Sequence, residues 1–308
     1  MRSLRTLLKH FGEGVLVAAG VSRLGLWLRR KRVLVLAYHN VVPDGMLGRG
    51  DASLHLGLSG FRRQLDLICS ACRPVCLGDV LSGDWKGQGN MMAVAITFDD
   101  AYRGAISLAI PELEKRGAPA TVFVAPGILG DRTLWWDALA TTEHGGVPPH
   151  LRDRILEEGR GRCDGAREVT GIEKVEWCEM PELMRTVGEE ELLTLRGRPG
   201  IRVGSHSWSH PSLVRFPAAD LSRELELPRA WLRERFGDSY LDVLAYPYGH
   251  CSPHVERASY AAGYEAALDL RGGTADPDDP ARRFRMARNN VPQGLSIPGL
   301  SLRLAGVR

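Results

Sequence analysis

Apolar residues in this chain gather in seven short runs, separated by longer stretches of mixed polarity. Most of the runs are continuously apolar, which is typical of parallel strands covered on both faces. We therefore predict strands over 32–38, 93–98, 120–125, 201–205, 241–246, 264–268 and 284–288.

Between these runs the apolar positions recur at helical spacing. Phe61, Leu65 and Ile68 share one face of a predicted helix over 59–72. Further helices, each ending in glycine, are expected over 105–117, 180–197, 217–237 and 252–263.

The repeated strand–helix order predicts an α/β fold with a parallel sheet. Seven strands favour a barrel with one unit fewer than the usual eight. The stretch 131–180 has little strand pattern, so we interpret it as an insertion after the third strand, helical in part and not a separate domain.

Polar side chains stand directly after several predicted strands. Because the carboxyl ends of parallel strands share one face, we expect these side chains to converge although they are far apart in the sequence. They are His39, Asp99, Asp100, His206, His210, Tyr246, Pro247, Tyr248 and Arg288.

Each of these signals also has a purely structural explanation. An Asp-Asp pair suits a turn or a helix cap, His39 suits a buried histidine, and "YPYG" at 246–249 suits a turn. Taken together, however, Asp100 with His206 and His210 is typical of a metal site with two histidines, one carboxylate and open positions. A divalent cation there would neutralise Asp100 and leave Asp99 as an ionised base.

Composition narrows the class of protein. The chain has 308 residues, 44% apolar and 25% charged, which is ordinary for a globular α/β barrel, and its net charge of +3 is too small to indicate nucleic acid binding. Six scattered cysteines without a clear signal peptide predict reduced thiols and a cytoplasmic location. Cys69 and Cys72 have a zinc-like spacing, but no second pair matches them.

The first 31 residues differ from the rest in charge. Residues 1–32 contain eight Lys or Arg and a single acid, Glu13, while apolar residues such as Leu8, Phe11 and Val15 recur at helical spacing. The longest uncharged stretch, 14–22, is far shorter than the roughly 20 residues needed to span a bilayer. We expect either a basic amphipathic helix at the surface of the inner membrane or a helix packed on the domain with a solvated basic face.

Three motifs in order resemble one known family. "TFDD" (97–100), "HSWSH" (206–210) and "YPYG" (246–249) are similar to those of the polysaccharide deacetylases, also called the NodB-homology domain or carbohydrate esterase family 4. "AYHNVV" (37–42) and "LWWD" (134–137) resemble the branch of bacterial poly-N-acetylglucosamine deacetylases. The resemblance covers about 33–295 and implies a distorted (β/α)7 barrel, which we place at 32–300.

The resemblance also implies chemistry and roles. The family hydrolyses N-acetyl groups on amino sugars with a divalent metal, zinc by default although nickel or cobalt would fit. It implies Asp99 as general base, His39 as general acid and the Tyr248 N–H as oxyanion donor. The implied metal ligands are Asp100, His206 and His210.

The chain departs from the family pattern at two places. Ala245 stands where many members have an arginine that orients the catalytic aspartate, and we predict that Arg288 takes its place. No late Leu-x-His motif is present, so the acid role rests on His39 alone.

Substrate contacts are expected from the aromatic and turn residues. Trp135 and Trp136 are expected to stack on sugar rings unless one of them is core, and Asp137 to bind a sugar hydroxyl or to cap a helix. Tyr246 and Pro247 are also placed at the substrate.

The expected substrate is an N-acetylated polysaccharide or glycolipid. The alternatives are deformylation or deacetylation of a small lipid-linked amino sugar, and a catalytically silent glycan-binding barrel. The sequence does not fix the oligomeric state.

Overall fold

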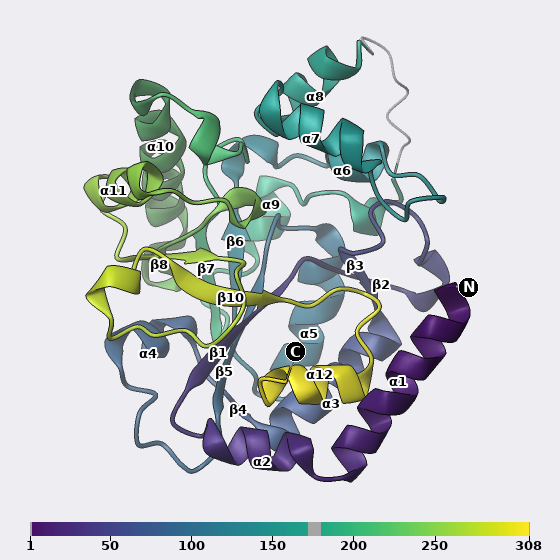
Figure 1. The fold of residues 1–308 in the computed structure, drawn as a ribbon. Helices are drawn as coiled ribbons and strands as arrows, with labels where there is room; N and C mark the ends of the chain where they lie inside the picture. The colour runs from purple at the N-terminus through teal and green to yellow at the C-terminus, as the bar shows by residue number, and fades with distance from the viewer. Residues whose placement is uncertain (1, 172–179, 308) are drawn as a thin grey trace.

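The centre of the molecule is a closed barrel of parallel strands (Figure 1). The computed structural model describes residues 2–171 and 180–307. Neighbouring strands follow the order β1-β10-β9-β8-β7-β6-β5, and β5 pairs with β1 to close the ring. The bounds are β1 Val33–Tyr38, β5 Ala93–Phe98, β6 Ala120–Val124, β7 Ile201–Ser205, β8 Tyr240–Ala245, β9 Ala266–Asp269 and β10 Met286–Asn290.

The seven predicted strands are thereby confirmed, each within two residues of its expected ends. Three short strands had no prediction: β2 (Asn40–Val42) and β3 (His55–Gly57), which pair with each other, and β4 (Arg73–Pro74), which pairs with β5. Two or three residues are too few to leave a pattern in the sequence.

Continuous apolar runs form these strands because both faces of each strand are covered. Val33 and Val35 of β1 belong to a cluster that draws side chains from β5, β6, β8, β9 and β10, so it fills the barrel interior. Leu34 and Leu36 point the other way, into the layer between the barrel and the surrounding helices. Successive side chains of a strand lie on opposite faces, so a run without polar residues satisfies both layers.

Helices surround the barrel. They are α1 Arg2–Ala18, α2 Val21–Leu28, α3 Leu58–Ala71, α4 Leu77–Ser82, α5 Ile110–Glu114, α6 Trp135–Ala138, α7 Pro149–Glu157, α8 Cys163–Thr170, α9 Glu189–Leu193, α10 Ala218–Phe236, α11 Pro253–Ala261 and α12 Ile297–Leu304.

The helix predicted over 180–197 is only partly present. The structure has a 3-10 turn at Glu182–Met184 and the short α9, with extended backbone between them. There, Thr186 donates its backbone N–H to the carbonyl of Arg132, and Arg103 donates to the carbonyl of Arg185. These tertiary hydrogen bonds replace the helical ones, so packing overrides the local helical pattern.

The stretch interpreted as an insertion follows β6, the third strand of the barrel. It contains α6, α7 and α8, which lie above the carboxyl edge of the barrel (Figure 1). Part of it, residues 172–179 with Cys178, lies outside the described residues.

The N-terminal helices lie against the end of the chain. Both α1 and α2 contact α12, so the first and last helices are neighbours, purple and yellow in Figure 1. Among the described helices, none alone combines the length and hydropathy needed to cross a bilayer. Leu7–Ala18 and Val21–Leu28 meet that test only together, as a pair bent by 65°.

Candidate metal centre and active site

Residues from several strand ends meet around one cavity at the carboxyl edge of the barrel. Its volume is about 160 Å³. The lining residues are His39, Asp51, Ser53, Leu54, Asp99, Asp100, Trp135, Trp136, Arg152, His206, His210, Tyr248, Leu270 and Asn290. The expected convergence of His39, the Asp pair, the His pair and Tyr248 is therefore present.

Three side chains in this cavity form a possible metal site. Asp100, His206 and His210 are all buried, and each offers a ligand atom within 4.8 Å of the other two. Asp100 Oδ1 lies 3.2 Å from His210 Nε2 and 3.6 Å from His206 Nε2. Ligands about 2.0–2.1 Å from a tetrahedral ion lie roughly 3.4 Å apart, so these separations suit such an ion.

The polar atoms of this trio fit a cation. Asp100 Oδ1 is buried and accepts no hydrogen bond, and His210 Nδ1 is also buried without a partner. His206 Nδ1 donates to the Ala245 carbonyl over 2.6 Å, which leaves its Nε2 with a free lone pair. Burial lowers the pKa of His206 to about 4, so the imidazole is neutral at physiological pH, as a metal ligand must be.

Backbone strain is concentrated at this site. Seven non-glycine residues in the described chain have positive φ, and five of them are at the cavity or beside it: Asp100, Ala101, Ser207, His210 and Tyr248. Left-handed backbone at such residues costs of the order of 1 kcal/mol each, and it persists only where the surroundings impose it. Here the turns after β5, β7 and β8 aim their side chains into one cavity.

The carboxylate of Glu224 on α10 fixes the loop that carries His206 and His210. The Glu224 carboxylate accepts hydrogen bonds from the backbone N–H groups of Trp208 and Ser209 and from the Ser209 hydroxyl, over 2.7–3.1 Å. Gly127 donates its N–H to the Trp208 carbonyl, and a Cβ there would approach that oxygen to 2.7 Å. The His-x-x-x-His spacing is therefore presented by a fixed loop and not by a helix.

Asp99 lies beside the trio and is bound to Arg288. The guanidinium donates from two nitrogens to the two carboxylate oxygens, over 2.6 and 2.9 Å, and both side chains are buried. Burial alone would raise the pKa of Asp99, but Arg288, helped by His206, outweighs it and holds the pKa well below its usual range. Asp99 is thus a carboxylate at physiological pH, and among the described residues Arg288 is the arginine that binds it.

We expect Arg288→Met to destabilise the protein by about 3–5 kcal/mol, because it leaves the Asp99 carboxylate buried without a partner. The measurement is urea unfolding. Arg235→Met is the matched control, since Arg235 binds Glu189 at a more exposed position, and it should cost about 0–1 kcal/mol. Equal losses of unfolding free energy in the two variants would mean that the buried Asp99–Arg288 pair stabilises the protein no more than an exposed ion pair does.

The double variant Asp99→Asn/Arg288→Met separates the pair from simple loss of packing. If an unpaired charge causes the loss, the double variant should be more stable than the sum of the two single changes predicts. If the losses of unfolding free energy in the two single variants add up to that of the double variant, an unpaired buried charge is not the cause.

An aromatic cluster forms one wall of the cavity. The centroid of the His210 ring lies 4.9 Å from that of Trp136 and 4.7 Å from that of Tyr248. Trp135 donates its indole N–H to the carbonyl of Gly161. Trp135 and Trp136 are only 1% and 6% exposed, so they line the cavity but offer little ring face for stacking on a sugar.

The expected substrate contact from Asp137 needs correction. Its side chain is fully buried, and its oxygens accept hydrogen bonds from His55 Nε2, the Asp51 backbone N–H and the Tyr102 hydroxyl. Tyr102 in turn accepts a hydrogen bond from the Trp136 indole over 2.7 Å. Asp137 therefore supports the aromatic wall from behind and does not reach the cavity.

The substrate contacts expected from Tyr246 and Pro247 also need correction. Tyr246 is buried in the cluster between α10 and α11, and its hydroxyl donates to the Phe284 carbonyl. Pro247 is buried as well. The strand ends at Ala245, and a 3-10 turn with left-handed backbone at Tyr248 (φ 59°) follows, so of the "YPYG" residues Tyr248 lines the cavity and Tyr246 does not.

The sequence interpretation missed several residues at the site. Tyr102, Asn40 and His55 form the buried network behind the wall, and Asn40 lies 3.0 Å from His55 Nδ1. Arg152 on α7 and Asn290 at the end of β10 line the cavity. Asn290 follows a predicted strand and was detectable by the same strand-end rule, whereas His55 and Arg152 carry no local signal.

Comparison with known protein families identifies the family of this chain. The sequence profile of the polysaccharide deacetylases matches residues 86–267, more than half of the chain. No curated protein matches the sequence.

Several solved structures share the fold. The deacetylase PplD of Streptococcus pyogenes, solved with acetate, aligns with a TM-score of 0.62 and 14% identity over 89% of this chain and 98% of its own. IcaB from Ammonifex degensii aligns with a TM-score of 0.60 and 21% identity over 90% of this chain and 97% of its own. The BpsB deacetylase domain from Bordetella bronchiseptica aligns with a TM-score of 0.55 and 15% identity over 85% of this chain and 96% of its own.

At these identities the structural likeness concerns the fold alone. The profile match, however, spans β5 to β9 and includes the "TFDD", "HSWSH" and "YPYG" motifs. On that match, this chain belongs to the polysaccharide deacetylase family, whose members are hydrolases acting on amide bonds of carbohydrates.

Proposed function

We propose that this protein removes the N-acetyl group from an amino sugar in a glycan with the help of a divalent metal ion, releasing acetate. One observation carries the proposal: three potential ligand atoms lie within 4.8 Å of one another, beside an ionised Asp99 carboxylate. Two imidazoles and one carboxylate suit zinc, and nickel or cobalt as alternatives.

In this proposal Asp100, His206 and His210 hold the ion. When bound, such an ion supplies Lewis acidity, which polarises a carbonyl oxygen and acidifies water. A cation there would also satisfy the buried Asp100 oxygen that accepts no hydrogen bond.

Asp99 is the proposed general base. Both of its oxygens bind Arg288, but each carboxylate oxygen retains a second lone pair that can accept the proton of the attacking water. Arg288 acts as a positioning residue, because it fixes the plane of the carboxylate toward the cavity and keeps it ionised. One proton moves to Asp99 while the water oxygen forms a bond to the acetyl carbon.

Collapse of the resulting oxyanion breaks the bond between carbon and nitrogen. The backbone N–H of Tyr248 is the proposed oxyanion donor, and a donor of this kind typically contributes about 3–4 kcal/mol. His39, half-buried at the end of β1 and lining the cavity, is the proposed acid that protonates the leaving nitrogen. The products are acetate and a free amine.

Acetate release from N-acetylglucosamine oligomers tests the function. We expect acetate to form, to stop on treatment with a chelator, and to return when zinc, nickel or cobalt is added. Release that is insensitive to the chelator would overturn the metal role. Formate from an N-formylated lipid-linked sugar would favour deformylation, and glycan binding without turnover or metal would favour a silent barrel.

We expect His39→Ala to lower the rate of acetate release by about 10²–10⁴-fold, the usual contribution of a positioned acid. Metal content should stay the same, because His39 is not one of the three proposed ligands. His144→Ala, at an exposed histidine, is the control. An unchanged rate in His39→Ala would remove this residue from the mechanism.

We propose further that the enzyme works in the cytoplasm at the inner membrane, on a polysaccharide precursor or a lipid-linked glycan. The support is the exposed apolar face of α1 and α2, with basic residues next to it.

A further inference from the structure

The helix α1 has its apolar face turned away from the protein. Leu7, Leu8, Phe11 and Val15 lie on one face at helical spacing and are 51–73% exposed. The polar Glu13 points the other way and accepts a hydrogen bond from Ser296 Oγ over 2.5 Å. A helix that packs on a soluble domain normally buries its apolar face and exposes its polar face. In α1 the apolar face is exposed, and no part of the described chain covers it.

The helix α2 extends the same exposed surface. Leu24, Trp27 and Leu28 are 58–64% exposed, whereas Gly25 faces the barrel side: a Cβ there would lie 2.6 Å from that of Ala305. This contact fixes α2 on α12. Eight of the thirteen exposed large apolar side chains in the described chain belong to α1 and α2, so the exposure is local and not scattered.

Cations flank this apolar face. Arg23, Lys31 and Arg32 are exposed, and Arg30 lies 4.4 Å above the Trp27 ring. Within the described chain, none of these four side chains forms an ion pair with a carboxylate. Apolar side chains bordered by unpaired cations are typical of helices that lie in the interface of an anionic bilayer.

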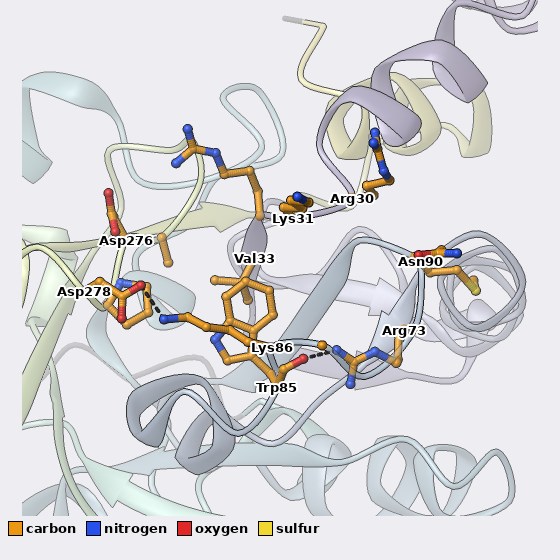
Figure 2. Close-up of a pocket in the computed structure, with 15 residues that line it drawn as sticks. Arg30, Lys31, Val33, Arg73, Trp85, Lys86, Asn90, Asp276 and Asp278 are labelled. Carbon is orange, nitrogen blue, oxygen red and sulfur yellow. Dashed lines mark hydrogen bonds and ion pairs between the residues drawn. The ribbon is translucent and has the colours of Figure 1, made fainter.

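A basic pocket opens beside the end of α2 (Figure 2). Its volume is about 450 Å³. It is lined by five cations, among them Arg73, and by two carboxylates, of which Asp278 is already bound to Lys86 over 2.5 Å. The indole N–H of Trp85, a residue only 7% exposed, has no hydrogen-bond partner. The pocket thus has excess positive charge and an unused donor, which suit a phosphate group.

We propose that α1, α2 and this pocket form one docking surface for a bilayer of anionic phospholipid. The apolar face enters the headgroup region, and the pocket takes the phosphate of one lipid. The inference rests on the proposed membrane setting but not on the proposed chemistry, because vesicle binding is measured without any glycan.

A second copy of the chain fits this surface less well. A two-fold contact would place the same patch of both subunits face to face, and the cations beside the apolar residues would then face one another. An anionic bilayer covers the apolar side chains and neutralises the cations together.

Vesicle flotation of the full chain tests the proposal. We expect binding to vesicles of phosphatidylcholine with phosphatidylglycerol, weak binding to phosphatidylcholine alone, and release by carbonate. Leu7→Ser/Phe11→Ser and Lys31→Glu/Arg32→Glu should each lower binding to the anionic vesicles by about tenfold or more. Trp85→Phe, which removes the indole N–H together with part of the ring, should lower it by about tenfold.

The matched controls are Tyr260→Ser and Arg196→Glu/Arg223→Glu, at exposed positions outside the surface, and both should bind as the unchanged protein does. Every variant should hydrolyse a soluble acetylated oligomer normally, since none of the residues lines the catalytic cavity.

Four outcomes would overturn the proposal. They are no binding to anionic vesicles, equal losses in the control variants, retention on vesicles after carbonate treatment, and a dimer in solution that Leu7→Ser/Phe11→Ser dissociates. Full binding by Trp85→Phe would remove the pocket from the surface.

Discussion

Asp99→Asn is expected to lower turnover by about 10²–10⁴-fold while the metal stays bound. The change replaces one carboxylate oxygen by an amide nitrogen of nearly the same size, so the shape of the cavity is kept. The amide cannot accept the proton of the attacking water, and a positioned general base commonly contributes a factor of this size. The measurement combines acetate release under saturating substrate with elemental analysis of the purified protein.

Folding has to be followed in the same variant. Asparagine leaves Arg288 buried without its anion, so we expect a lower melting temperature as well as a lower rate. Asp242→Asn is the control, because Asp242 binds Arg229 and Arg233 far from the cavity and should keep full activity. A rate within tenfold of the unchanged enzyme in folded Asp99→Asn would contradict the base assignment.

His206→Ala is expected to remove metal and activity together. Of the three proposed ligands, His206 has a fixed ring orientation, because its Nδ1 donates to the Ala245 carbonyl and its Nε2 faces Asp100. The Lewis acidity of a metal contributes several kcal/mol to such a reaction, so turnover should fall by at least about 10²–10³-fold. Metal content and acetate release are measured on the same sample.

His250→Ala provides the comparison for this variant. His250 lies near the same rim of the barrel, where Ser212 Oγ is 3.2 Å from its Nδ1, but it is not among the three clustered groups. We expect it to keep both metal and activity. Equal loss of metal in both variants would mean that the ion is bound elsewhere.

The barrel and the cavity could be predicted because their signals are local. A strand buried on both faces is apolar without interruption, and a side chain that follows it stands at the carboxyl edge. Knowing only these two rules, one obtains β1, β5 and β7 and the meeting of Asp100, His206 and His210. That Arg288 takes the place of the arginine absent at Ala245 stays a prediction, and the structure shows the contact of Arg288 with Asp99.

The errors arise where long-range contacts decide. Asp137 resembled a ligand for sugar because the sequence does not reveal that His55 and Tyr102 reach it from other segments. Likewise, the exposed face of α1 could not be derived from periodicity, since an amphipathic pattern does not indicate which face turns inward. The pattern predicted the helix, and only the contact of Glu13 with Ser296 fixed its orientation.

The closure of the ring by β1 has a consequence for biosynthesis. β1 is the first barrel strand to leave the ribosome, yet one of its two neighbours, β10, is the last. Arg288 reaches Asp99 across a sequence separation of 189 residues, so during translation this carboxylate has no guanidinium partner until β10 emerges. We therefore expect the barrel to remain an open sheet during translation, and Asp99 to acquire its contact with Arg288 only after β10 has emerged.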